Sequence, residues 1–151
     1  MEVVVDASLA TMWSVPEPLS EAALRRASRW AEENTRMMAP CLLVAEVTNA
    51  IYKRVRRAEM DLSTAQAALS VALAFPIDLV EEASLPSRAL ALADEHRRPN
   101  TYDCHYLALA ERHRCELWTG DERFYNSVRE RLPWVKWIGK VDGESPAEQT
   151  R

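Results

Sequence analysis

Glycine and cysteine are scarce in this chain of 151 residues, and each occurs only three times. The cysteines, Cys41, Cys104 and Cys115, are widely spaced and form no Cys-x-x-Cys pair. A disulfide framework and a cysteine-based zinc site are therefore not expected, and we predict three small, buried hydrophobic residues instead. A chain of about 150 residues buries roughly 68–70% of its unfolded surface, so it needs no disulfide bond to be stable.

Long apolar runs and a basic character are also missing. No run approaches the roughly 20 residues that span a bilayer, so no membrane association is expected. The first residues enter an apolar run without the basic stretch of a secretory signal, so no such signal is expected. The odd number and wide spacing of the cysteines favour a reducing cytoplasm. The net charge of −4 argues against indiscriminate nucleic-acid binding. It leaves room for an enzyme that concentrates acids in one pocket and basic residues around its rim.

Short apolar runs alternate with longer amphipathic stretches along the chain. Strands are predicted at residues 3–5, 37–39, 77–80, 117–119 and 135–138, and helices at 8–13, 20–34, 42–58, 63–75, 84–95, 101–113 and 121–132. Ser8 is expected to cap the first helix, and Ser63 with Gln66 to form a capping box for the fourth. The order βααβααβααβαβ predicts an α/β domain with a central, mostly parallel sheet of about five strands and helices on both faces. It spans residues 1–140, and a polar, disordered tail is expected over 141–151.

Four acidic residues stand out against this pattern. Asp6 and Asp121 each come directly after a predicted strand or its turn, at the edge where parallel sheets bind ligands, although either could simply cap a helix. Asp103 lies in the first turn of a predicted helix, where the backbone dipole alone favours a negative charge. Glu46 is surrounded by apolar residues of helix 42–58, a costly position unless the carboxylate is paired, protonated or bound to a cation.

These four carboxylates would repel one another if they converged. Two such charges about 4 Å apart cost on the order of 4 kcal/mol at an effective dielectric constant of 20. A protein that keeps them must offset this cost with protons or a cation, and an oxygen-only set of ligands selects Mg²⁺ or Mn²⁺. Such an ion lowers the pKa of a bound water and stabilises charge on a phosphate. The sequence therefore predicts a metal-dependent phosphodiesterase site.

Four segments carry a resemblance to a known family. They are Val4-Val5-Asp6-Ala7-Ser8, the stretch from Ala39-Pro40 through Glu46-Val47-Thr48-Asn49-Ala50, Tyr102-Asp103-Cys104-His105-Tyr106-Leu107-Ala108-Leu109-Ala110, and Trp118-Thr119-Gly120-Asp121-Glu122-Arg123-Phe124. In this order and spacing the chain resembles the PIN-domain ribonucleases over residues 2–139, in particular the VapC-type toxins of type II toxin–antitoxin pairs. The resemblance implies a three-layer PIN-like fold, an RNA substrate and a small antitoxin partner.

The resemblance also implies roles for single residues. Asp6 and Asp103 match the acids that usually hold one or two Mg²⁺ ions, and Glu46 and Asp121 match the second and fourth acids. Supporting polar residues correspond to Asn49 and Thr119. One position departs from the family, because Met12 stands where many relatives have a lysine before the tryptophan. A contact to RNA or to a partner made by that lysine would be lost here.

Basic residues near the acids are candidate phosphate contacts. Lys53 and Arg57 share one helical face with Glu46, and Arg97 and Arg98 come shortly before Asp103. The alternative is a plain solvated helix end, since cations near a helix C-terminus are favourable in themselves.

Assembly with other chains is also expected. A homodimer is implied by the resemblance and favoured by Leu19, Ala23 and Trp30, which we expect to be exposed on the early helices. An arginine from an extended antitoxin segment would enter the acidic pocket and form charge-assisted hydrogen bonds there. The early helices would supply an apolar groove for the rest of that segment.

Two other functions remain open at this stage. A catalytically silent PIN-like module would bind RNA or protein only, but it would be expected to have lost at least one acid. A phosphotransfer receiver or an aspartyl-phosphate phosphatase shares the α/β class. The phosphatase usually has a second acid two positions after its first Asp, where this chain has Ser8. His105 is a conceivable general acid, although a packing role is favoured.

Overall fold

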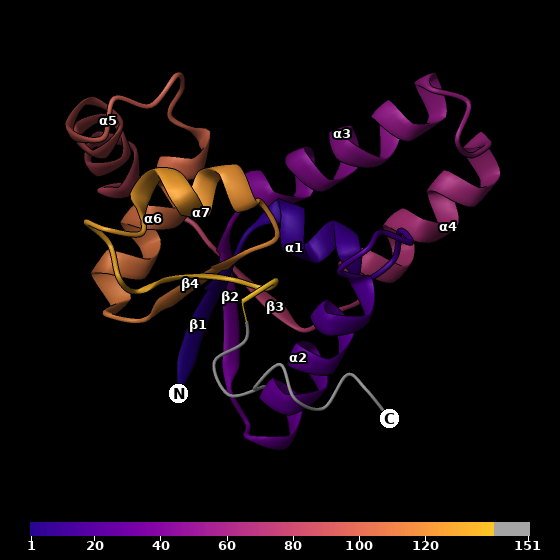
Figure 1. Ribbon diagram of the computed structural model, residues 1–151, viewed down its shortest axis with the longest axis horizontal. Coiled ribbons are helices and arrows are strands. Elements are labelled where there is room, and N and C mark those ends of the chain that lie inside the picture. Colours follow the sequence, from indigo (N-terminus) through magenta and orange to yellow (C-terminus); the bar gives the residue numbers. More distant parts are fainter. Residues whose placement is uncertain (141–151) are drawn as a thin grey trace.

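A computed structural model describes residues 1–140, and the predicted tail over 141–151 lies outside the described residues. The order of elements is the predicted βααβααβααβαβ (Figure 1). The strands are β1 Glu2–Val5, β2 Arg36–Pro40, β3 Ile77–Val80, β4 Glu116–Thr119 and β5 Val135–Trp137; the helices are α1 Ala7–Met12, α2 Ser20–Glu32, α3 Leu42–Arg56, α4 Leu62–Leu73, α5 Leu85–Glu95, α6 Tyr102–His113 and α7 Glu122–Val128. No helix within residues 1–140 combines the length and apolar character that a bilayer span requires.

The five strands form one sheet in the order β3-β2-β1-β4-β5, and all neighbouring pairs are parallel. The chain builds β1, β2 and β3 outward in one direction and then returns to place β4 on the other side of β1. The strand order therefore reverses between β1 and β4. In open parallel sheets, ligands bind outside the carboxyl ends of the strands at such a reversal.

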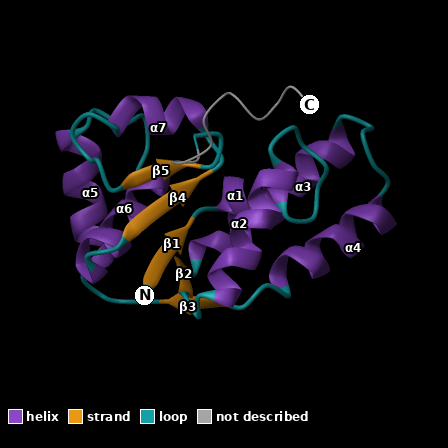
Figure 2. Cartoon of the chain, turned by 60° about the horizontal axis from the view of Figure 1, so that its bottom comes forward, coloured by secondary structure: helices purple, strands orange, loops and turns teal. Residues whose placement is uncertain are grey.

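Helices cover both faces of the sheet, as predicted. Helix α6 packs on β1, β2 and β4, with α5 against its outer side, and Figure 2 shows α2 on the opposite side of the sheet. There Trp30 of α2 meets Trp118 of β4 edge to face, with 5.6 Å between ring centroids. Trp30 is 3% exposed and Ala23 is fully buried, so the predicted exposure of these two side chains was wrong. They belong to the core of a single chain because the apolar face of α2 closes this layer.

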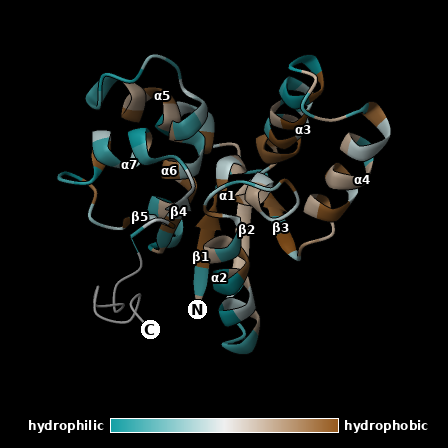
Figure 3. Cartoon of the chain, turned by 45° about the vertical axis from the view of Figure 1, so that its right-hand side comes forward, coloured by the Kyte–Doolittle hydropathy of each residue, from teal (hydrophilic) through white to brown (hydrophobic). Residues whose placement is uncertain are grey.

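Apolar side chains are exposed on the hairpin of α3 and α4 instead. This hairpin extends away from the sheet in Figure 1, and Figure 3 shows apolar residues along it. The exposed side chains here are Tyr52, Leu62, Val71 and Leu73. Any apolar contact with another chain would find more surface on this hairpin than on α2.

Aspartates rather than serines begin two of the helices. The Asp6 carboxylate caps α1 by accepting from the Leu9 N–H at 3.0 Å, and Asp61 caps α4 by accepting from the Thr64 N–H at 2.7 Å. The predicted cap at Ser8 and the predicted capping box at Ser63 were therefore wrong. In both cases an aspartate two residues earlier has extended backbone and reaches the free N–H first.

The cysteines are only partly as predicted. All three are free thiols; Cys104 is buried and Cys115 is half-buried, as expected of small core residues, but Cys41 is exposed just before α3. Cys41 is thus a correction to the predicted set of buried cysteines.

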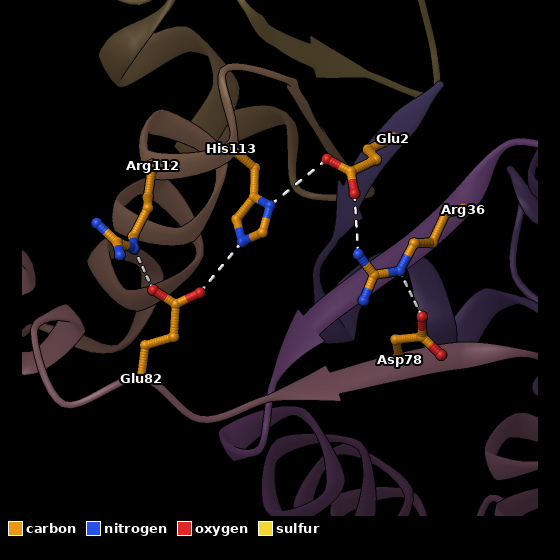
Figure 4. A network of polar contacts seen from close by, with 6 residues as sticks. All are labelled: Glu2, Arg36, Asp78, Glu82, Arg112 and His113. Atoms are coloured by element: carbon orange, nitrogen blue, oxygen red, sulfur yellow. Dashed lines mark hydrogen bonds and ion pairs between the residues drawn. The ribbon is translucent and has the colours of Figure 1, made fainter.

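A network of charged side chains joins the opposite edge of the sheet, near the amino ends of β1 and β2 (Figure 4). Arg36 donates to Glu2 at 2.9 Å and to Asp78 at 2.5 Å, which links the first three strands. His113, at the end of α6, lies between Glu2 and Glu82, and Arg112 also contacts Glu82. The carboxyl ends of the strands, where Asp6 and Asp121 lie, are separate from this network.

Candidate functional site

A pocket of about 320 Å³ lies beyond the carboxyl ends of β1 and β4. It is lined by Asp6, Ala7, Ser8, Glu46, Asn49, Ala50, Lys53, Asp103, Tyr106 and Asp121. All four acids selected from the sequence thus meet in one place, together with Asn49 and Lys53. A larger pocket of about 700 Å³ at the other edge has a mainly apolar lining and none of these residues.

Asp6 follows β1 directly and is almost fully buried, with 6% of its surface exposed. Its Oδ1 accepts from the Ser8 hydroxyl at 2.6 Å and from the Leu9 N–H at 3.0 Å. Burial raises the pKa of this carboxyl to about 6, although the hydroxyls of Ser8 and Thr119 and the Leu9 N–H act in the opposite direction. Asp6 is therefore both a helix cap and a wall of the pocket.

Two hydroxyl groups brace the floor of the pocket between α1 and the turn after β4. The hydroxyl oxygens of Ser8 and Thr119 lie 3.2 Å apart. The Gly120 N–H donates to Ser8 at 2.9 Å, and the Asp121 N–H donates to the Thr119 oxygen at 3.0 Å. Thr119 was selected from the sequence as a supporting residue, whereas Ser8 was missed. Its spacing of two residues from Asp6 was the available signal.

Glu46 is half-buried on α3 and accepts a hydrogen bond from the Tyr106 hydroxyl at 2.7 Å. Burial raises the pKa of Glu46, the hydrogen bond from Tyr106 lowers it, and the charge of Asp103 raises it again. Burial and the neighbouring Glu46 also raise the pKa of Tyr106, which therefore remains a proton donor. Sequence reasoning missed Tyr106, although it lies three residues after Asp103 and so shares a face of α6 with it.

Asp103 lies in the first turn of α6 and is paired with Arg98 at 3.2 Å. Burial raises the pKa of Asp103, Arg98 lowers it and the charge of Asp121 raises it. Arg98 also donates to Ser127 at 2.6 Å, and its guanidinium lies 5.2 Å from the centre of the Phe124 ring. The guanidinium thus points inward against an acid of the pocket, whereas the sequence had suggested a position at its rim.

The remaining candidate residues differ in their distance from the pocket. Asp121 is exposed and caps α7 by accepting from the Phe124 N–H at 3.1 Å, which leaves its second oxygen for other partners. Arg57 lines a neighbouring groove, and Arg97 lies apart from both, beside a shallow pocket of the α5–α6 loop. His105 packs with its Nδ1 at 2.8 Å from the Thr101 carbonyl oxygen. That contact agrees with the packing role that the sequence favoured.

The four carboxylates act on one another through Asp103. Its charge raises the pKa of Asp6 and of Glu46, and its own pKa is raised by Asp121. Such a site favours either protons or a cation.

The lining suits a hydrated divalent ion. Within the described residues, no three acidic, histidine or cysteine side chains converge closely enough to chelate a metal directly. Mg²⁺, however, usually keeps several waters and binds through one or two carboxylates. The all-oxygen set of acids and the Asn49 amide therefore fit such an ion.

Comparisons with known proteins concern the family and the fold of the chain. The family model of the PIN domain matches residues 3–129. A comparison with curated protein sequences gave no significant match.

Three solved structures are similar in fold. PAE2754 from Pyrobaculum aerophilum has 21% identity and a TM-score of 0.66, covering 92% of this chain and 90% of that one. VapC20 from Mycobacterium tuberculosis, described as a Sarcin-Ricin loop cleaving toxin, has 18% identity and a TM-score of 0.61, covering 83% and 94%. A toxin–antitoxin complex from Klebsiella pneumoniae has 20% identity and a TM-score of 0.51, covering 92% and 99%. At these identities the likeness concerns the fold.

Proposed function

This chain belongs to the PIN-domain family, and from that premise we propose that it is a Mg²⁺-dependent endoribonuclease that acts as the toxin of a toxin–antitoxin pair. It hydrolyses RNA phosphodiester bonds at the site formed by Asp6, Glu46, Asp103 and Asp121. The observation that supports this activity most directly is the convergence of these four acids on one pocket at the reversal of strand order.

The ion, Mg²⁺ or Mn²⁺, would be held by Asp6 and Asp103, with Glu46 and Asp121 binding it directly or through water. When bound, it lowers the pKa of a water and stabilises the charge that develops on the phosphate. The described contacts support a rigid arrangement of the ligands. Asp6 is fixed by Ser8 and the Leu9 N–H.

Two of the acids are oriented by longer side chains. Tyr106 holds one oxygen of Glu46, and Arg98 holds one oxygen of Asp103. In each case the other oxygen of the carboxylate remains for the ion or the substrate. Burial raises the pKa of Glu46, which makes its carboxylate a stronger proton acceptor than that of an ordinary glutamate.

The toxin role is extended to this chain from its structural neighbours. One of them is described as a toxin that cleaves the Sarcin-Ricin loop, and another is a toxin–antitoxin complex. Four carboxylates in one pocket would attract an arginine from a small antitoxin protein, which would displace the ion and block the site. A cytoplasmic location follows from this role.

A homodimer is part of the proposal as well. The apolar side chains that favour it are those exposed on α3 and α4, such as Tyr52 and Leu62, rather than those of α2.

The activity is tested by incubating purified protein with RNA and Mg²⁺ or Mn²⁺. Cleavage should stop when a chelator is added. Asp6→Asn and Asp103→Asn should abolish it while the protein remains folded. Asp78→Asn, an exposed aspartate at the opposite edge, is the matched control and should cleave normally. Full activity in both pocket variants would reject the site, and RNA binding without cleavage by the wild type would favour a silent module.

The toxin role has a separate test in living bacteria. Expression of the wild-type chain should arrest growth, and Asp6→Asn should relieve the arrest. A wild-type chain that is harmless at high expression, but cleaves RNA well when purified, would instead be a processing nuclease.

A further inference from the structure

A groove of about 440 Å³ continues from the acidic pocket on the side of α1. The two cavities share Ser8, Ala50, Lys53 and Asp121, so they are parts of one depression. The groove is lined further by Thr11, Met12, Glu17, Arg54, Arg57, Gly120, Glu122 and Arg123. Its volume falls within the roughly 300–1,000 Å³ of pockets that hold small molecules, which leaves room for a nucleotide.

Positive charge is present on both walls of the groove. Lys53 lies in the last turn of α3, Arg57 directly follows that helix, and Arg123 lies in the first turn of α7. All three are exposed, and none forms an ion pair with another residue of the described range. Three cations without partners, next to an acidic pocket, are available to an external anion.

Arg54 differs from these three, although it lines the same groove. Its guanidinium pairs with Glu17 at 2.5 Å and with Glu59 at 3.2 Å. The charge of Arg54 is thus neutralised within the protein. The Arg98 guanidinium is likewise occupied by Asp103 and Ser127 on the other side of the pocket.

Met12 and Gly120 make the floor of the groove tight and uncharged. A Cβ at Gly120 would lie 2.6 Å from the Met12 Cε and 3.1 Å from the backbone carbonyl carbon of Ser8. The absence of a side chain at Gly120 therefore lets this turn pack closely against Met12 and the Ser8 backbone. The basic residues of the groove thus lie beside an uncharged floor, and the groove adjoins the pocket that holds the acids.

From this arrangement we infer that the RNA strand enters the active site along this groove and that Lys53, Arg57 and Arg123 bind the phosphates on that side of the scissile bond. Arg54, Arg97 and Arg98 do not contact those phosphates. The inference rests on the proposed nuclease function, since it assigns the substrate path to the same site. The sequence suggested Lys53, Arg57, Arg97 and Arg98 as phosphate contacts. The inference adds Arg123 to this set and excludes Arg97 and Arg98.

The experiment measures the binding of a short, fluorescein-labelled single-stranded RNA by fluorescence anisotropy at several salt concentrations, with chelator present so that no cleavage occurs. Each phosphate contact that is lost lowers the slope of log K against log salt by about 0.7 for single strands. The triple variant Lys53→Gln, Arg57→Gln, Arg123→Gln should therefore have a slope smaller by about 2. Its melting temperature should remain that of the parent, because no ion pair is removed.

A second triple variant controls for net charge. Arg56→Gln, Lys136→Gln and Lys140→Gln remove the same total charge, but none of these residues lines the groove or the acidic pocket. This variant should keep the slope of the wild type. An equal decrease of the salt slope in the two triple variants would overturn the inference, because RNA binding would then depend on the overall charge of the protein.

Cleavage assays separate the inference from the proposed function. With Mg²⁺, the groove variant should show a raised KM for RNA, and the double variant Arg57→Gln, Arg123→Gln, which leaves the lining of the acidic pocket unchanged, should raise KM more than it lowers kcat. If the wild type binds RNA through the groove but never cleaves it, the proposed nuclease function is rejected and the inferred RNA path is retained. If the groove variant has the salt slope and the KM of the wild type, the inferred RNA path is rejected and the proposed nuclease function is retained.

Discussion

Asp6 combines two roles in one side chain. The same carboxylate caps α1 and contributes to the acidic pocket, and the sequence alone presented these as alternatives. Ser8 and the Leu9 N–H both bond to one oxygen, Oδ1, so capping does not consume the whole group. At the scale of single residues, a structural and a functional interpretation of an acid are therefore compatible.

Burial of Asp6 makes the metal-free protein sensitive to pH. Its pKa of about 6 in the folded state exceeds the ordinary value of 3.8, so the ionised form is disfavoured by folding. Its contribution to stability is complete below about pH 4 and is lost as the pH rises through about 6, by at most about 3 kcal/mol. Asp6→Asn keeps an oxygen for the cap and has no charge.

We therefore expect Asp6→Asn to raise the free energy of unfolding at pH 7.5 with chelator present, and to change it little at pH 4. Urea denaturation at both pH values measures this difference, and Asp78→Asn serves as the exposed control. A variant that is equally destabilised at both pH values would show that the cap, not the buried charge, dominates at Asp6.

The Tyr106 hydroxyl is expected to tune Glu46. Tyr106→Phe removes the hydrogen bond that lowers the pKa of Glu46, so that pKa should rise and the activity profile should move to higher pH. The rate should fall by about tenfold or more, as is typical when a group that orients a ligand is lost. Tyr52→Phe, on the exposed face of α3, is the control. An unchanged pH profile in Tyr106→Phe would contradict this role.

At the scale of elements, periodicity predicted the secondary structure well because short, mainly apolar strands alternate with longer helices, most of which bury one face. The exact ends were less predictable. Helix α2 ends at Glu32 rather than 34, where Asn34 adopts a left-handed conformation, and α7 ends at Val128 rather than 132. Such ends depend on local hydrogen bonds that hydrophobic patterns do not encode.

The partners of the acids were also beyond the sequence. The order of strands, with β4 beside β1, depends on long-range packing, and this order brings Asp121 toward Asp6. Ser8 and Tyr106 support the acids through contacts that spacing alone could only suggest. The inward position of Arg98 depends on Ser127 and Phe124, which are distant in sequence.

The turn between β4 and α7 leaves little space for a side chain at Gly120. In Gly120→Ala the new Cβ would press on the Met12 side chain and the Ser8 backbone. We expect a loss of about 1–3 kcal/mol in the free energy of unfolding, as for other overpacked sites, together with reduced RNA cleavage. Met12→Ala in the same protein should restore part of the cleavage, because it removes the closest contact.

Thermal melts and cleavage rates of Gly120→Ala and of the double variant measure this effect. A Gly120→Ala variant with the melting temperature and the cleavage rate of the wild type would contradict this expectation.

At the scale of the whole molecule, the two edges of the sheet differ in character. The amino edge joins the first three strands and α6 by ion pairs between partly exposed groups, which solvent screens. The carboxyl edge instead gathers four acids in one pocket. The groove that adjoins this pocket contains three cations without ion-pair partners among the described residues. The first edge balances its charges internally, whereas the second presents acids and cations without internal partners, as the proposed binding of an ion and of RNA needs.

Direct titration with Mn²⁺ tests the central claim, that the four carboxylates form one cation site. Free Mn²⁺ is followed by electron paramagnetic resonance while wild type, Asp103→Asn or Asp78→Asn is added at neutral pH. The wild type and Asp78→Asn should bind Mn²⁺ alike. Asp103→Asn should bind at least about tenfold more weakly, because Asp103 interacts with all three other acids. Equal affinity of Asp103→Asn and the wild type would contradict the site.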